Sequence, residues 1–297
     1  MIARTNRYAP LEAFAAPAKP YAQIWRGMLG LGVIVAFYLL SGWAMILFFS
    51  SMLDDFSMLR LFQEIAHGST PRGLAILLAS FAPLLIATFV VSRHLHHRAP
   101  ATLFGRRSLA TFTKVLPVLL LFALFSFGLT QLSEAAARSN PLLHVLSWAP
   151  IALPLLFVQI ATEEVLFRGY LLQQLAARWR SPLIWMVLPS ALFGALHYSP
   201  GAYGSNALWP ALWAFGFGCL ASDLTARTGN LGAALALHFA NNFGSLFLVG
   251  FYGQLDGLAL YTIVINTRDL WDLLPWLLLD MLHLLIAWLL IRLTLRV

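Results

Sequence analysis

Long apolar stretches with very few charges constrain this chain more than any other feature. Of its 297 residues, 60% are hydrophobic and 10% are charged, whereas a soluble domain has about 25% charged residues. So few charges cannot cover a water-facing surface, but a surface that faces lipid needs none. A helical span takes about 20 apolar residues to cross the hydrocarbon core, and several stretches reach that length. The sequence therefore predicts a multi-spanning membrane protein.

These stretches predict helices rather than strands. The hydrocarbon core admits only helices and closed barrels, because backbone hydrogen bonds must be satisfied within the protein. The stretches are continuously apolar and lack the alternation of barrel strands. We therefore expect an all-α transmembrane bundle of about eight spans. The predicted spans are 28–50, 73–92, 113–131, 149–168, 183–199, 207–226, 231–251 and 273–294.

Basic residues indicate how the bundle lies in the membrane. They concentrate in alternate connecting segments, which predicts that both termini are cytoplasmic. We expect a cytoplasmic segment at 1–27, with no cleavable signal peptide, and the bundle at 28–297. The net charge of +7 belongs to the ends of the spans, so we expect no nucleic-acid partner. The compact loops favour a prokaryotic plasma (inner) membrane, and the single Cys219 excludes a cysteine-based zinc site.

Two polar clusters are explained without a catalytic role. The run Arg93-His94-Leu95-His96-His97-Arg98 is expected to lie at the interface and face anionic lipid headgroups. Asp280 and His283, which are one helical turn apart, are expected to pair inside the bundle.

The span at 149–168 contains charges that need a stronger reason. A charge near the bilayer centre costs about 2.5–3.5 kcal/mol on insertion scales. Glu164 and Arg168 are four residues apart, so they can pair on one helical face. Glu163 points elsewhere on the helix, and an unpaired carboxylate in lipid protonates or finds a partner on another helix. We expect Glu163 to face His197 and His238 across the bundle, with a water molecule or a metal ion between them.

Two later spans supply histidines and an amide. His197 ends the predicted span 183–199, and His238 and Asn242 share one helical face because they are four residues apart. Taken singly, each residue can be a structural hydrogen-bonding group between helices. Taken together with the two glutamates, they offer a base, metal ligands and donors for an oxyanion.

Three motifs in this region resemble those of a known family. Glu163-Glu164-x-x-x-Arg168, Phe193-x-x-x-His197 and His238-x-x-x-Asn242 stand in the order found in the CPBP intramembrane proteases. This group is also called the Abi family, and it includes the type II CAAX prenyl endopeptidases. The resemblance covers about residues 145–250, and eight spans suit the family.

The resemblance implies a role for each motif residue. Glu163 would be the base that activates water, and His197 would assist it or bind metal. His238 and Asn242 would stabilise the oxyanion, while Glu164 and Arg168 would orient the site. Two mechanisms stay open, because Glu163, His197 and His238 could hold a catalytic zinc ion with one open position or act on water without metal.

The predicted function is therefore that of an intramembrane endopeptidase. Its expected partners are the lipid bilayer and a membrane-associated peptide or protein substrate. Two alternatives are a proton-coupled transporter, since buried carboxylates and histidines also relay protons, and a non-catalytic scaffold or immunity protein of the same fold.

Overall fold

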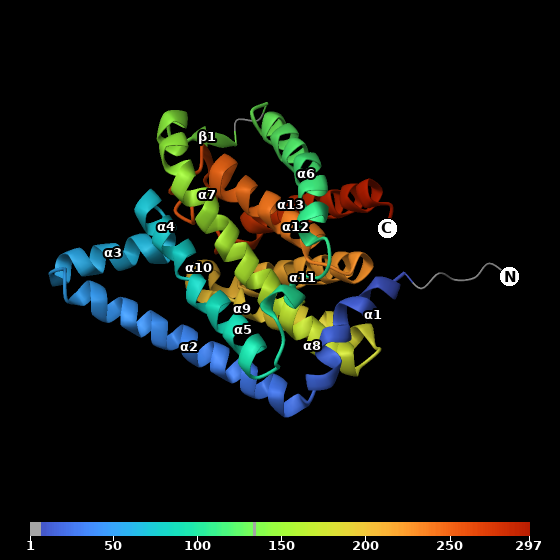
Figure 1. The fold of residues 1–297 in the computed structure, drawn as a ribbon. Coiled ribbons are helices and arrows are strands. Elements are labelled where there is room, and N and C mark those ends of the chain that lie inside the picture. The colour runs from blue at the N-terminus through green and yellow to red at the C-terminus, as the bar shows by residue number, and fades with distance from the viewer. Residues whose placement is uncertain (1–6, 133–134) are drawn as a thin grey trace.

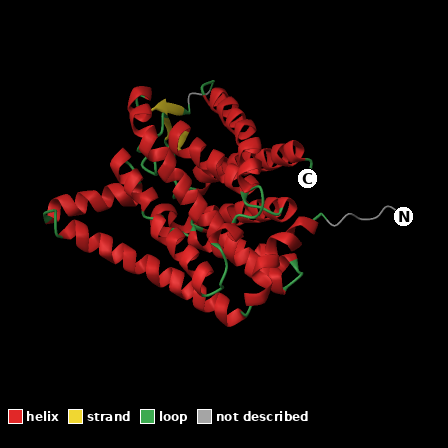
Figure 2. Cartoon of the chain, viewed as in Figure 1, coloured by secondary structure: helices red, strands yellow, loops and turns green. Residues whose placement is uncertain are grey.

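The computed structural model describes residues 7–132 and 135–297, and nearly all of its regular structure is helical (Figure 2). The α-helices are α1 (Ala9–Ala15), α2 (Ile24–Ser50), α3 (Asp55–His67), α4 (Pro71–Ala79), α5 (Ala82–His94), α6 (Ser108–Thr130), α7 (Leu142–Glu164), α8 (Leu172–Arg178), α9 (Leu188–Leu196), α10 (Pro200–Tyr203), α11 (Leu208–Thr228), α12 (Gly232–Phe243) and α13 (Leu270–Leu295). The 3-10 segments are η1 (Ala16–Tyr21), η2 (Pro100–Leu103) and η5 (Gly204–Asn206), and the π-helical segments are η3 (Val165–Leu171), η4 (Leu183–Val187) and η6 (Gly244–Leu248).

The fold is a polytopic helical bundle, as the sequence predicts. Within the described residues, five helical stretches are long and apolar enough to span a membrane, and a broken span formed by Leu183–Leu196 and Pro200–Asn206, which meet at a 59° bend, would be a sixth. The five stretches are Ile24–Ser50, Pro71–His94, Ser108–Thr130, Leu142–Arg178 and Leu270–Leu295.

The sequence predicts eight spans. The two that are not among these six stretches, 207–226 and 231–251, correspond to α11 and α12. Helix α12 has 12 residues, about 18 Å at a rise of 1.5 Å per residue, against a hydrocarbon core of about 30 Å. Its residues from Gly232 to His238 are all buried in the bundle. A helix that is apolar all round can lie in lipid or in a protein core, so composition alone does not separate the two. The orientation of the termini and the identity of the membrane stay predictions.

Helices α11 and α12 lie at the centre of the bundle, where α12 packs on α6, α7 and α11 (Figure 1). Helix α9 lies tightly against α11 because small residues let their backbones approach. A Cβ atom on Gly194 would lie 2.7 Å from the carbonyl oxygen of Ala211, and one on Gly218 would lie 2.8 Å from Cβ of Ser190. This close packing fixes the end of α9, where His197 lies.

The longest span changes its helical type at the predicted motif. Helix α7 ends at Glu164, and the chain continues without a break through the π-helical η3 into α8. Single π-helical turns within α-helices are rare and are frequent at functional sites. The change of pitch follows directly after the two glutamates, so it resets the direction in which Arg168 projects.

A small sheet lies at one end of the bundle (Figure 2). Strand β3 (Tyr261–Ile263) pairs with β1 (Ala136–Arg138) in antiparallel register and with β2 (Val249–Phe251) in parallel register. Strands β1 and β3 belong to connecting segments for which the sequence predicts no structure, whereas β2 lies at the end of the predicted span 231–251, so the helical prediction is wrong there. The strands join the start of α7 to the segment that follows α12.

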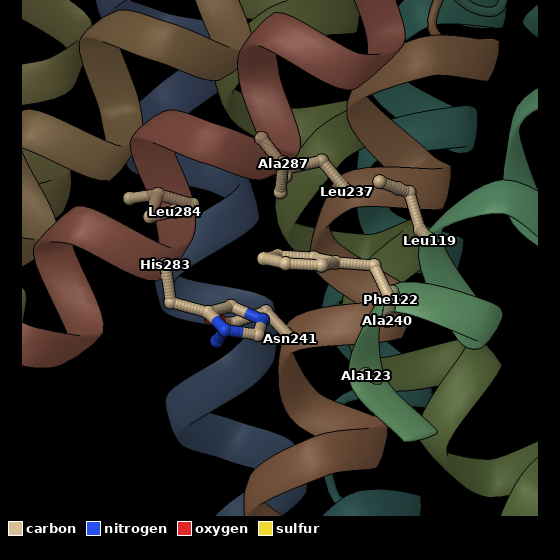
Figure 3. Close-up of a pocket in the computed structure, with 9 residues that line it drawn as sticks. All are labelled: Leu119, Phe122, Ala123, Leu237, Ala240, Asn241, His283, Leu284 and Ala287. Atoms are coloured by element: carbon tan, nitrogen blue, oxygen red, sulfur yellow. The ribbon is translucent and has the colours of Figure 1, made fainter. Parts of the chain in front are cut away.

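Two of the structural explanations offered for polar clusters are wrong in part. His283 does not pair with Asp280 as expected, but stacks on Phe122 with 4.3 Å between ring centroids and lies 3.3 Å from Ser126 Oγ. Figure 3 shows this imidazole beside a cavity of about 10 Å³ that is also lined by Asn241. The cavity has room for about one water molecule. In the basic run, His96 and Arg98 are buried rather than turned to the lipid surface.

Candidate active site

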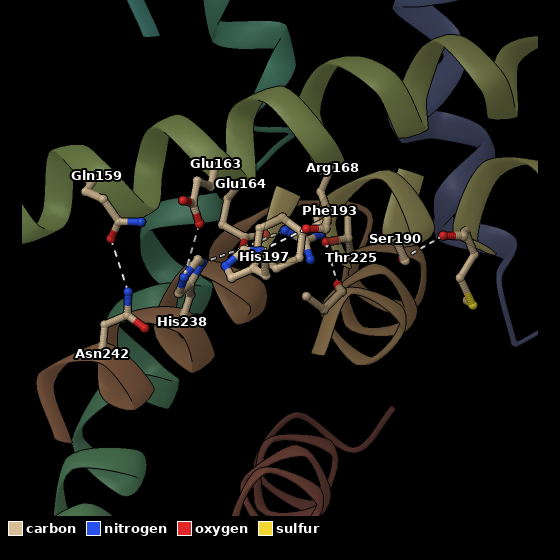
Figure 4. Close-up of polar contacts among 12 residues, drawn as sticks. Gln159, Glu163, Glu164, Arg168, Ser190, Phe193, His197, Thr225, His238 and Asn242 are labelled. Atoms are coloured by element: carbon tan, nitrogen blue, oxygen red, sulfur yellow. Dashed lines mark hydrogen bonds and ion pairs between the residues drawn. The ribbon is translucent and has the colours of Figure 1, made fainter. Parts of the chain in front are cut away.

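A buried ion pair forms the rigid part of the site. Arg168 Nη1 donates to Glu164 Oε1 at 2.9 Å, and the side chains are 1% and 0% exposed. The four-residue spacing predicts this pair, and the structure contains it. His238 Nδ1 lies 2.8 Å from the same carboxylate oxygen. Glu164 therefore holds an arginine from its own stretch of helix and a histidine from α12 (Figure 4).

This geometry determines where the proton on His238 resides. A carboxylate paired with arginine is ionised and accepts hydrogen bonds only, so Nδ1 of His238 carries hydrogen. Nε2 then points away from Glu164, and it lies 3.5 Å from Oε2 of Glu163. The imidazole is thus held between two consecutive carboxylates that contact opposite ring nitrogens.

Glu163 is held much less tightly than Glu164. Its side chain is 13% exposed, and 3.5 Å is too long for a strong hydrogen bond, although it suits an ion pair. The sequence predicts a contact between Glu163 and His238 across the bundle, and the structure contains it. Glu163 therefore combines proximity to a histidine with freedom to bind another group.

His197 lies at the end of α9, next to the bend that separates it from α10. Its Nδ1 lies 2.8 Å from the carbonyl oxygen of Phe193. A carbonyl oxygen only accepts, so Nδ1 is the donor, and in the neutral imidazole Nε2 is left as an acceptor. The ring of Phe193 lies 4.5 Å from that of His197 and 6.4 Å from that of His238, by centroids. The phenylalanine therefore separates and supports the two histidines.

Aromatic rings also enclose the buried arginine. The guanidinium of Arg168 lies 4.8 Å from the ring centroid of Phe193 and 5.7 Å from that of Phe217. Phe217 is also 4.7 Å from the ring of His238. Desolvated cation–π contacts stabilise a guanidinium where water is excluded. The aromatic position of the second motif thus supports the arginine of the first and the histidine of the third.

Asn242 belongs to an amide cluster that includes a residue the motifs do not contain. Its Nδ2 donates to Gln159 Oε1 at 3.1 Å (Figure 4). Its Oδ1 accepts from Asn241 Nδ2 at 3.2 Å. Gln159 is buried and precedes Glu163 by four residues, so it lies on the same face of α7. Glu163 and Gln159 therefore face His238 and Asn242 as two matching pairs. The same spacing in the sequence could have identified Gln159 as a site residue.

The residues fit a metal ion poorly. Within residues 7–132 and 135–297, no group of three or more His, Cys, Asp or Glu side chains is arranged to hold one. Nδ1 of His238 and Nδ1 of His197 are both engaged within the protein, so only their Nε2 atoms could bind a metal, and within the described residues these two atoms and the carboxylate of Glu163 do not form such a group. We therefore derive no step that passes through a metal.

The fold and the site define a polytopic membrane protein with a buried glutamate–histidine centre. Residues 145–244 match the family model described as Type II CAAX prenyl endopeptidase Rce1-like. This match confirms the resemblance that the three motifs show, and it covers 100 of the 297 residues of the chain.

One curated relative extends the comparison. "Uncharacterized protein YyaK" from Bacillus subtilis (strain 168) is 30% identical to this chain over 122 residues, which are 41% of each of the two proteins. The similarity therefore spans less than half of that relative. No solved structure matches the chain.

Proposed function

We propose that this chain is an intramembrane endopeptidase that hydrolyses a peptide bond in a membrane-associated protein or peptide. The observation that carries the proposal is the placement of His238 between Glu164, which is ionised and fixed, and Glu163, which is loosely held. A site with one fixed and one available carboxylate suits acid–base chemistry, because the two groups take different roles. The family match at residues 145–244 supports the same reaction class.

In the proposed reaction, Glu163 takes a proton from a water molecule, and the resulting hydroxide attacks the carbonyl carbon of the scissile bond. His197 assists by accepting a hydrogen bond from that water at Nε2. The protonated Glu163 then gives its proton to the leaving amine as the carbon–nitrogen bond breaks. Both hydrogen atoms of the water molecule are accounted for. One passes through Glu163 to the amine, and the other stays on the hydroxyl group of the new carboxylic acid.

The negative oxygen of the tetrahedral intermediate needs hydrogen-bond donors. Asn242 has one N–H beyond the one that it gives to Gln159, and His238 offers Nε2–H when it is protonated. Preorganised donors of this kind stabilise the transition state without rearrangement. Glu164 holds the imidazole of His238 in place, and Arg168 holds Glu164.

The test uses the full chain, purified and reconstituted in lipid vesicles. It is incubated with a set of transmembrane and lipid-modified peptides, and the products are identified by mass spectrometry. We expect cleavage by the natural chain and none by Glu163→Gln. A chain that cleaves no member of the set, and whose vesicles instead accumulate a solute with a proton gradient, would support the transporter alternative.

A further inference from the structure

The basic segment Arg93–Arg98, which begins in the last turn of α5, is a separate feature of the fold, outside the glutamate–histidine site. Three of its side chains, Arg93, His94 and His97, are exposed and line an open hollow of about 330 Å³. The two others, His96 and Arg98, are 0% and 4% exposed. The segment therefore presents the guanidinium of Arg93 and two imidazoles at its surface, and it buries the guanidinium of Arg98.

The buried part anchors the segment rigidly to the bundle. His96 Nε2 lies 2.8 Å from the hydroxyl of Tyr170, and Arg98 Nη2 donates to Gln173 Oε1. Tyr170 itself needs a close neighbour without a side chain, because a Cβ atom on Gly30 would collide with its hydroxyl. Both anchors lie on the stretch that carries Glu164 and Arg168, so the basic segment is fixed to the longest span.

No acidic side chain among residues 7–132 and 135–297 forms an ion pair with the arginines of this segment. The hydrogen bonds of Arg98 go to the neutral side chains of Gln173 and Thr102. The ion pairs among the described residues include none of Arg26, Arg93 and Arg98. A buried guanidinium is ordinarily paired with an acidic group, so the buried Arg98 departs from the usual arrangement.

Hydrogen-bonding capacity is also left over at the same place. Nε of Arg26, Nε of Arg98 and Oγ of Ser92 are buried without a hydrogen-bond partner among the described residues. Arg26 contacts this segment directly, since its Nη1 donates to the carbonyl oxygen of Leu95 at 2.7 Å. Buried donors without a partner are uncommon in native proteins. Here two of the three belong to arginines that form no ion pair among the described residues.

The electrostatics of His96 agree with this description. The pKa of His96 is lowered to about 4, chiefly by burial and also by the positive charges of Arg98, Arg26 and His97, and its contact with the carbonyl of Tyr21 opposes this change. His97 itself has a left-handed backbone with φ of +48°, which is uncommon for a residue other than glycine and costs energy. Strain of this kind is retained where the surrounding structure holds a functional group in place.

We propose that this segment is a binding site for an anionic phosphate group, formed by Arg93, His94 and His97 at the surface with Arg26 and Arg98 behind them. Guanidinium groups bind phosphate through charge-assisted hydrogen bonds. The site lies at the end of the span Pro71–His94. Phospholipid headgroups lie at the ends of membrane spans. Free phosphate has the same chemistry, so the experiment separates the two sources.

The experiment measures thermal unfolding of the full chain in a neutral detergent. Short-chain phosphatidylglycerol, short-chain phosphatidylcholine and inorganic phosphate are each titrated at constant ionic strength. We expect Tm to rise with phosphatidylglycerol, because a ligand that binds only the folded state stabilises it. The rise should shrink as sodium chloride is increased, since salt screens exposed charges.

The variant Arg93→Gln with His97→Gln removes two exposed side chains and leaves the buried anchors intact. We expect its affinity for phosphatidylglycerol to fall roughly five- to ten-fold. The matched control, Arg106→Gln with Arg180→Gln, removes two exposed arginines from other connecting segments and should bind as the natural chain does. A rise in Tm with inorganic phosphate alone, lost in the first variant, supports the site with free phosphate as its ligand. Equal responses of the two variants, or no response to any of the three probes, overturn the proposal.

Discussion

Glu163 and Glu164 are consecutive in the chain, yet they contact opposite nitrogens of the same imidazole. Oε1 of Glu164 lies 2.8 Å from Nδ1 of His238, and Oε2 of Glu163 lies 3.5 Å from Nε2. One carboxylate also holds Arg168, and the other is partly exposed. The two residues therefore share a histidine but differ in how firmly they are bound, and this difference makes their substitution separable by experiment.

Glu163→Gln should remove peptide cleavage while leaving the fold intact. The amide keeps the shape of the side chain but cannot take a proton from water, and a general base contributes about 10²- to 10⁴-fold to rate. The long contact with His238 suggests little loss of stability. The measurement is cleavage of a peptide found in the substrate set, together with Tm in detergent. Cleavage at the natural rate would refute the role of Glu163 as base.

Glu164→Gln should instead destabilise the protein. It leaves the guanidinium of Arg168 buried without a counter-charge, and removing one partner of a buried ion pair costs about 3–5 kcal/mol. Thermal unfolding of the purified protein measures the loss. The matched control is Glu12→Gln, whose pair with Lys19 is exposed and 3.5 Å long, so its effect should be about 0–1 kcal/mol. Similar losses in the two variants would contradict the structural role of Glu164.

Asn242→Ala should lower turnover more than stability, because it removes an oxyanion donor. Loss of one such donor costs about 2.7–4 kcal/mol of transition-state stabilisation in other enzymes. Gln159→Leu should give a smaller decrease in kcat, with KM nearly unchanged, because the Asn242 amide remains but loses the hydrogen bond that orients it. Gln159→Glu, which keeps an acceptor, should restore part of kcat. If Asn242→Ala fails to accumulate or melts early, its role is to join helices.

The sequence predicts the contacts that depend on helical spacing. Glu164 with Arg168, and His238 with Asn242, follow from four-residue spacing within one helix, whatever the rest of the fold does. The bend of 59° after His197 does not follow, because its angle depends on how the chain packs beyond the predicted span 183–199 and not on spacing within it. The burial of Arg98 was missed for the same reason, since its partner Gln173 lies far away in the chain.

A zinc-dependent reaction is one of the two mechanisms that the sequence leaves open, and metal analysis can test it. The donor arrangement leads us to expect that cleavage persists after treatment with a strong chelator, because no three His, Cys, Asp or Glu side chains among the described residues are arranged to hold a metal. The purified chain should contain much less than one zinc ion per molecule by elemental analysis. Loss of cleavage on chelation, recovered when zinc is added back, would show that Glu163, His197 and His238 rearrange to bind the metal.

The stability of the protein should fall in mild acid because of His96. Its pKa is lowered from 6.5 to about 4 in the folded protein, chiefly by burial, so the unfolded chain binds a proton in a range where the folded one does not. Stability is therefore full above pH 6.5 and is lost progressively as the pH falls toward 4. The loss from this residue is at most about 3 kcal/mol.

Other groups titrate in the same range, so the informative quantity is a difference between two proteins. His96→Gln keeps a polar side chain that can contact Tyr170 but cannot be protonated. Unfolding is measured for both proteins between pH 4.5 and pH 8 in the same detergent. The variant should be less stable than the natural chain near neutral pH, because it loses the fitted imidazole, and the gap should close as the pH falls. A gap that stays constant with pH would mean that His96 is not the group responsible for the acid sensitivity.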